Sequence, residues 1–133
     1  MGYASAVDNI ERVHDLTKAY LGDAIYGTYI RQYIIENQPE IRADEAHKIA
    51  NQMVSAKGQS KALLHLREER IISEEEWDIA RKARNKSSAT RAKNASIKEY
   101  RNATGIEALI GELYLKGSTK RIEELMKEIY KLG

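Results

Sequence analysis

Two carboxylates stand inside stretches of the chain that are otherwise apolar. Asp23 is the only charged residue of Ala19–Tyr26, and Glu107 lies beside the apolar side chains of Ala103–Leu115. Apolar residues recur at helical spacing in both stretches, which predicts two helices packed on a core. A lone carboxylate is costly to bury unless something pairs with it or coordinates it. No lysine or arginine lies within four residues of Glu107, so we expect the two acids to hold a hard divalent cation.

Such a site suits the hydrolysis of a phosphodiester. The reaction needs a nucleophilic water and stabilisation of charge on the phosphate, and magnesium held by carboxylates supplies both. Two neighbouring carboxylates repel each other and raise one pKa, a penalty that a bound cation removes. The alternative, judged from the residues alone, is that Asp23 and Glu107 hydrogen bond to backbone groups or hydroxyls and carry no chemistry.

A basic segment interrupts an otherwise acidic chain. The formal net charge is +2, but Arg81–Arg101 holds eight lysines and arginines and one acid, a local charge of +7. A concentration of positive charge on an acidic protein indicates a surface for a polyanion. The alternative is a solvated basic loop that binds nothing in particular.

The remaining pattern is helical throughout. One proline, eight glycines and many good helix formers in 133 residues predict a single all-α domain spanning residues 1–133, with Met1–Asn9 frayed. The first helix should run from Ile10 or Asp15 to Glu36, with Leu16, Tyr20 and Ala24 on its core face. We expect Gly22 to let another helix approach this helix beside Asp23. Further helices are expected from Asp44 as N-cap, over Ala56–Glu69, after the capping-box sequence Ser73–Glu76, around Glu107, and from Ser118 or Thr119. The helix over Ala56–Glu69 should bury Leu63, Leu64 and Leu66. A short helix at about Ile97–Arg101 either stands alone or merges into the helix around Glu107. Asn85–Asn94 is predicted to be a loop.

Cysteine and hydropathy patterns limit the other classes of function. There is no cysteine, which excludes disulfides and cysteine-ligated zinc and permits a reducing cytoplasm. His14, His47 and His65 do not have zinc-motif spacing. We expect no signal peptide and no membrane-spanning segment, because no charge-free apolar run approaches the length of about 20 residues that a bilayer requires.

Several ordered motifs resemble the ribonuclease III family. Leu21-Gly22-Asp23-Ala24 resembles its signature helix, and Glu107-Ala108-Leu109-Ile110-Gly111 resembles its second catalytic helix. The small bacterial subfamily called Mini-ribonuclease III is the most similar. Its other motifs are matched by Val54-Ser55-Ala56-Lys57-x-Gln59, Arg84-Asn85-x-x-Ser88, Lys93-Asn94 and Tyr100-Arg101-x-x-Thr104.

The resemblance implies a bundle of about six to seven helices with a double-stranded-RNA endonuclease site. It assigns Asp23 and Glu107 as catalytic residues and as ligands of Mg²⁺, with Mn²⁺ as a substitute. It also implies a cytoplasmic homodimer that matures the large-subunit ribosomal RNA precursor, helped by a large-subunit ribosomal protein. We expect the extra apolar residues of the first helix, Tyr26, Tyr29 and Ile30, at the subunit interface. Ala19 and Thr104 stand where other family members have a further Glu and Asp. This departure supports a competing interpretation, a catalytically weak or inactive helical RNA-binding or interaction protein.

The catalytic domain is expected to hold its own RNA, because only 22 residues follow Gly111 and they leave no room for a double-stranded-RNA-binding domain. Duplex RNA is recognised through its shape and backbone, which suits basic and hydroxyl side chains. The predicted RNA contacts are Arg84, Asn85, Lys86, Ser87, Arg91, Lys93, Asn94, His47, Lys48, Lys57 and Arg101. For Ser55, Lys57 and Gln59 two roles stay open, contact with RNA and capping of a helix.

Overall fold

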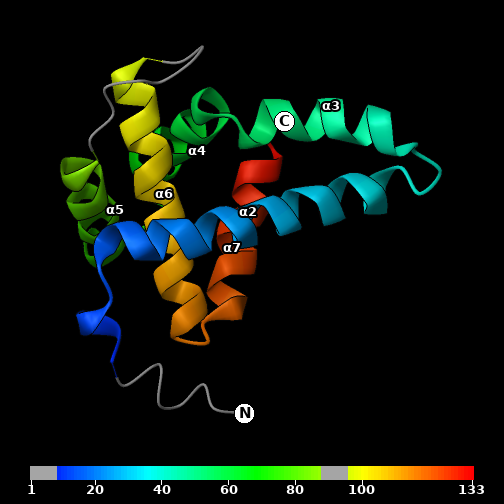
Figure 1. The fold of residues 1–133 in the computed structure, drawn as a ribbon. Coiled ribbons are helices and arrows are strands. Elements are labelled where there is room, and N and C mark those ends of the chain that lie inside the picture. The colour runs from blue at the N-terminus through cyan, green and yellow to red at the C-terminus, as the bar shows by residue number, and fades with distance from the viewer. Residues whose placement is uncertain (1–8, 88–95) are drawn as a thin grey trace.

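The computed structural model describes residues 9–87 and 96–133 (Figure 1). Within these ranges the protein is all helical, as predicted, and has no strand. The elements are the 3₁₀ helix η1 (Ile10–Arg12) and the helices α2 (Asp15–Asn37), α3 (Ala43–Val54), α4 (Ala56–Glu68), α5 (Glu74–Lys86), α6 (Ile97–Leu115) and α7 (Thr119–Tyr130). None of these helices is long and apolar enough to cross a membrane.

Helix α6 is the centre of the molecule. It packs against α2, α4 and α5, and almost every residue from Asn102 to Leu113 is buried. A helix that is apolar on all sides needs neighbours on all sides, and Figure 1 shows α6 crossing behind α2 with α5 and α7 beside it. The predicted short helix at Ile97–Arg101 is therefore the first part of α6, which Ser96 opens with a capping box.

Two glycines bring α2 and α6 into backbone contact. A Cβ on Gly22 would lie 1.6 Å from the carbonyl oxygen of Glu107, and a Cβ on Gly111 would lie 2.0 Å from that of Lys18. Real side chains do not approach a backbone so closely, so any larger residue at either position would force the helices apart. The prediction that Gly22 admits another helix beside Asp23 is confirmed.

The close crossing explains why the predicted core face of α2 is partly wrong. Leu16, Tyr20 and Ala24 were expected in the core, but Tyr20 is 82% exposed and Leu16 43%. The face that meets the core includes the small residues Ala19 and Gly22 instead. Hydrophobicity alone favours large residues as core markers, whereas a tight helix crossing selects small ones.

Several helix ends agree with the sequence and others do not. Ser73 and Glu76 form the predicted capping box of α5, and Gly117 follows α6 with a φ of +74°. Helix α3 begins one residue before Asp44, so that residue is not its N-cap. Helix α5 continues through Asn85 and Lys86, which were expected in a loop, and residues 88–94 of that loop lie outside the described residues. Leu64, expected in the core, is exposed on α4.

Candidate active site

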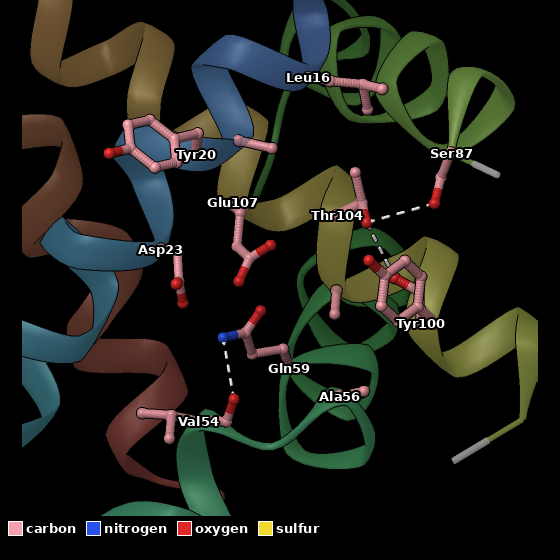
Figure 2. A pocket seen from close by; sticks show the side chains of 12 residues that line it. Leu16, Tyr20, Asp23, Val54, Ala56, Gln59, Ser87, Tyr100, Thr104 and Glu107 are labelled. Atoms are coloured by element: carbon pink, nitrogen blue, oxygen red, sulfur yellow. Dashed lines mark hydrogen bonds between the residues drawn. The ribbon is translucent and has the colours of Figure 1, made fainter. Parts of the chain in front are cut away.

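Asp23 and Glu107 face one pocket of about 440 Å³ at the α2–α6 crossing. Asp23 comes from α2, and Glu107 from the buried middle of α6. Figure 2 shows the two carboxyl groups next to each other, both directed into the pocket, with the side chain of Gln59 from α4 below them. The two acids come together in one pocket, as expected from the sequence. Asp23 is exposed, however, and Glu107 is only partly buried.

The pocket perturbs the ionisation of Glu107. Burial, followed by the negative charge of Asp23, raises the pKa of the Glu107 carboxyl to about 8. The hydroxyl of Tyr26 is buried without a hydrogen-bond partner among the described residues, and its pKa is raised by burial and then by the charge of Glu107. A carboxylate pair of this kind is a location where a cation would be stabilised.

The donors of the pocket fit a divalent cation held by few protein ligands. Two carboxylates converge, and no histidine, cysteine or third acid joins them within the described ranges. The remaining polar lining consists of Gln59, Ser87, Tyr100 and Thr104. Magnesium often keeps several waters and takes only one or two carboxylates, completed by substrate phosphate, so two acids and open space are sufficient ligands for it.

Ala19 and Thr104 also line the pocket, which places the two departures from the family pattern next to the acids. The Thr104 hydroxyl donates to the carbonyl of Tyr100 at 3.1 Å and lies 3.5 Å from the hydroxyl of Ser87. Ser87, expected in the loop Asn85–Asn94, directly follows α5 as its C-cap and is buried. Because both hydroxyls line the pocket, they are available to a phosphate oxygen or a water there.

The predicted RNA contacts are not gathered in one place. Of the described ones, only Ser87 lines the pocket with the acids. Arg84 is half-buried with its guanidinium 5.6 Å from the Trp77 ring, so it also has a packing role. Lys86 pairs with Asp15 at 2.9 Å, and Lys57 lines a second pocket with Tyr26.

The other predicted contacts are exposed or undescribed. Asn85, His47, Lys48 and Arg101 are all exposed, and Arg101 follows the pocket residue Tyr100 on α6. Arg91, Lys93 and Asn94 lie outside the described residues.

Sequence reasoning missed two buried polar residues near the acids. Tyr26 was assigned to an interface between subunits, but it is fully buried in the core together with Ile30. Gln59 was weighed as a helix cap or RNA contact, yet it is buried beside Glu107. The available signal was a polar side chain on the apolar face of α4, one turn before Leu63.

The chain is similar to known ribonucleases. The family model of the Ribonuclease III domain matches residues 17–118 of the chain. The chain is 38% identical over 132 residues to Mini-ribonuclease 3 of Clostridium tetani, which covers 99% of this chain and 86% of that protein. Mini-ribonuclease 3 of Brevibacillus brevis is 42% identical over 86% of this chain and 84% of its own. A crystal structure of a Fusobacterium nucleatum protein is similar with a TM-score of 0.80 at 29% identity, covering 92% of this chain and 96% of that one.

Proposed function

The chain belongs to the ribonuclease III family, and from this membership we propose that it is an endoribonuclease that cleaves double-stranded RNA by divalent-metal-dependent hydrolysis of phosphodiester bonds. The observation that carries the proposal is the convergence of Asp23 and Glu107 in one pocket. The printed name of the relatives, Mini-ribonuclease 3, supports the reaction class.

Asp23 and Glu107 would hold the cation, Mg²⁺ or Mn²⁺ in its place. The bound cation supplies a nucleophilic water and stabilises charge on the phosphate. The fold fixes the separation of the two acids, because the backbones of α2 and α6 are in contact at Gly22. The hydroxyls of Ser87 and Thr104 line the same pocket. The Ser87 hydroxyl would donate a hydrogen bond to a phosphate oxygen and orient the backbone of the RNA. The Thr104 hydroxyl gives its proton to the Tyr100 carbonyl, so it would accept a hydrogen bond from a water.

The raised pKa of Glu107 agrees with this role. A carboxyl that resists ionisation without a cation becomes a ligand when positive charge enters the pocket, because the cation reverses the sign of the local field. In the alternative, both acids only form hydrogen bonds with neighbouring groups. No positive charge would then offset the burial and the charge of Asp23 that raise the pKa of Glu107.

The substrate is proposed to be the precursor of large-subunit ribosomal RNA, in the cytoplasm and with a large-subunit ribosomal protein as helper. This part rests on the family resemblance alone. RNA contacts beyond the pocket are assigned to Arg101 and the exposed cations Lys48, Lys57 and Lys86, with His47 and Asn85. Arg84 contributes through its exposed part, and Arg91, Lys93 and Asn94 complete the set.

A homodimer is part of the proposal, because duplex RNA has two antiparallel strands and a two-fold axis places one site on each. Support comes from the exposed apolar side chains of Leu16 and Tyr20 on α2, which border the pocket. Tyr26 and Ile30 were expected to contribute, but both are fully buried within the monomer. Sedimentation at micromolar concentration should give a dimer, and Tyr20→Ser should shift it toward monomer.

The deciding experiment is a cleavage assay on a plain RNA duplex. Cleavage into products with 5′-phosphate and 3′-hydroxyl ends should require Mg²⁺ or Mn²⁺ and stop in chelator. The matched control is the same strand without its complement, which should stay intact. Binding of the duplex without any cleavage at saturating cation would favour the competing function, an inactive RNA-binding protein, for which the absence of acids at Ala19 and Thr104 is the argument.

A further inference from the structure

Gln59 is a buried side-chain amide in the candidate active site. It lies in the first turn of α4, is 1% exposed and lines the pocket with Asp23 and Glu107. Its Nε2 donates to the carbonyl oxygen of Val54, the last residue of α3, at 3.1 Å. The amide is therefore anchored across the α3–α4 junction, by a main-chain group that cannot rotate away.

The hydrogen-bonding capacity of this amide is not exhausted. A glutamine carries two N–H donors and one acceptor oxygen. The Val54 carbonyl can only accept, so it fixes the nitrogen on its side. One of the two N–H donors is thus left over, the Gln59 side chain lines the same pocket as Glu107, and Figure 2 shows the amide below the two acids. The oxygen Oε1 is buried and has no partner among the described residues.

An unpaired buried oxygen requires an explanation. Leaving such a group unsatisfied forfeits the hydrogen bonds that it makes to water in the unfolded chain, and in native proteins an ordered water or an ion commonly provides the partner. The pocket that Gln59 lines has a volume of about 440 Å³ and several polar walls, which is ample room for water. A water there would lie between the amide and the carboxylates.

We propose that Gln59 is a positioning residue of this site: it holds the Glu107 carboxyl through its amide N–H and offers Oε1 to a water of the hydration shell of the cation. This inference rests on the proposed function. It also gives a reason why two acids suffice in a pocket where Ala19 and Thr104 supply no carboxylate, because an amide anchored by the main chain orders part of the shell. Groups that orient ligands in this way commonly change metal affinity by about 10–100-fold.

Asn102 provides a matched control. It is also 1% exposed, its Nδ2 donates to the Ser60 hydroxyl at 2.9 Å, and its Oδ1 likewise has no partner among the described residues. It differs from Gln59 in one respect that matters here, because Asn102 is not among the residues that line the pocket. A general effect of losing a buried amide should appear in both residues, and an effect on the site only in Gln59.

The experiment titrates Mn²⁺ into the full chain without RNA and follows binding by calorimetry. Gln59→Met, which nearly conserves volume, should weaken Mn²⁺ binding by about 10-fold. Asn102→Leu should bind Mn²⁺ as the parent does, although both variants lose stability. Turnover of duplex RNA by Gln59→Met should recover as Mn²⁺ is raised, since Asp23 and Glu107 remain.

A second variant should strengthen Mn²⁺ binding instead of weakening it. Gln59→Glu keeps the length of the side chain and adds a third carboxylate, so Mn²⁺ should raise its melting temperature more than that of the parent, because affinity for hard cations rises with ligand charge. If Gln59→Met does not fold, this variant decides. Parent-like Mn²⁺ binding by Gln59→Met, or a parent-like Mn²⁺ shift by Gln59→Glu, would overturn the inference. A parent that neither binds Mn²⁺ nor cleaves duplex RNA would instead defeat the proposed function.

Discussion

Helices α2 and α6 meet with opposite electrostatics at neighbouring points of their crossing. At one point Lys18 donates to Glu112 at 2.6 Å, both side chains are buried, and Lys116 adds a second contact to Glu112 at 2.8 Å. At the other point Asp23 faces Glu107, with no cationic side chain among the residues that line their pocket. The first pair is satisfied by the protein itself, and the second is not.

The difference separates a structural role from a functional one. A buried pair of opposite charges with its hydrogen bonds made needs nothing further to be stable in the fold. A pair of like charges is unfavourable in the empty protein, and perturbed groups of this kind cluster at functional sites. The following variants test whether the two pairs differ in this way, ordered by the size of the expected effect.

Neutralising the acid pair should remove activity without harming the fold. Asp23→Asn and Glu107→Gln should each lower turnover of duplex RNA by about 10²–10³-fold or more, the scale for a group that stabilises the transition state. Thermal unfolding in chelator above pH 8, where Glu107 is ionised, should show both variants at least as stable as the parent, because one of two repelling charges is gone. The double variant should be little worse than either single one, since residues of one site act as a unit. If Asp23→Asn folds and turns over duplex RNA as fast as the parent, the acid pair has no functional role that distinguishes it from the Lys18–Glu112 pair.

Breaking the opposite-charge pair should do the reverse. Lys18→Met leaves Glu112 buried with only Lys116, and we expect a loss of about 3 kcal/mol in the free energy of unfolding, the low end for a broken buried pair. Urea denaturation measures this loss. Lys18→Met combined with Glu112→Met should regain much of it, because no charge is then left uncompensated. Lys116→Met is the control, with a loss below about 1 kcal/mol, since Lys116 is 44% exposed.

The two pairs should also respond to pH in opposite directions. The pKa of Glu107 is about 8, so the native protein keeps a proton that the unfolded chain releases near the ordinary value of 4.5. Stability in chelator should therefore fall as pH rises from about 5 to 8, with a slope of at most about 1.4 kcal/mol per pH unit. Glu107→Gln should flatten this slope, and so should Mn²⁺. A flat profile for the parent would contradict the raised pKa.

Glu112 should behave in the other sense. Burial acts to raise its pKa, but the hydrogen bonds from Lys116 and Lys18 outweigh burial and leave the pKa of Glu112 below its ordinary value of 4.5. Its contribution to stability is thus complete above that ordinary value and is lost on acidification through the lowered pKa. Lys18→Met should weaken this acid dependence and leave the alkaline one unchanged.

The smallest effect is expected outside both pairs. Lys86 pairs with Asp15 at 2.9 Å but is largely exposed, so Lys86→Ala should cost less than about 1 kcal/mol of stability. If it contacts the RNA backbone, binding should weaken alike for all duplexes and the salt slope should fall by about one. Lys127→Ala on α7 is the control. An unchanged slope for Lys86→Ala would leave that residue as a surface ion pair.

The positions of the helices and the meeting of the two acids could be predicted from the sequence. The buried face of α2 and the role of Gln59 could not, because they depend on tertiary packing. Helical periodicity, the capping box at Ser73 and the turn at Gly117 are local signals, so the helices were largely predictable. The meeting of Asp23 and Glu107 followed from two apolar helices that each carried a carboxylate. The buried face of α2 could not be predicted. Tyr20 has the size and apolar ring of a core residue, but the close contact of α2 with α6 at Gly22 leaves it exposed. Gln59 was missed because its meaning depends on Val54 and Glu107, which lie near it only in space.

The backbone contact between Gly22 and Glu107 has a consequence for how this chain can change over evolution or by engineering. Side-chain packing adapts to substitutions by small shifts, but main chains in contact cannot move closer and are held from moving apart by Lys18 and Glu112 next to them. The spacing of the acids is thus inherited from the scaffold and does not need to be rebuilt when the pocket wall varies. Pocket-lining residues other than Asp23, Glu107 and Gln59 are free to vary and to change substrate choice, whereas Gly22 and Gly111 cannot accept a side chain.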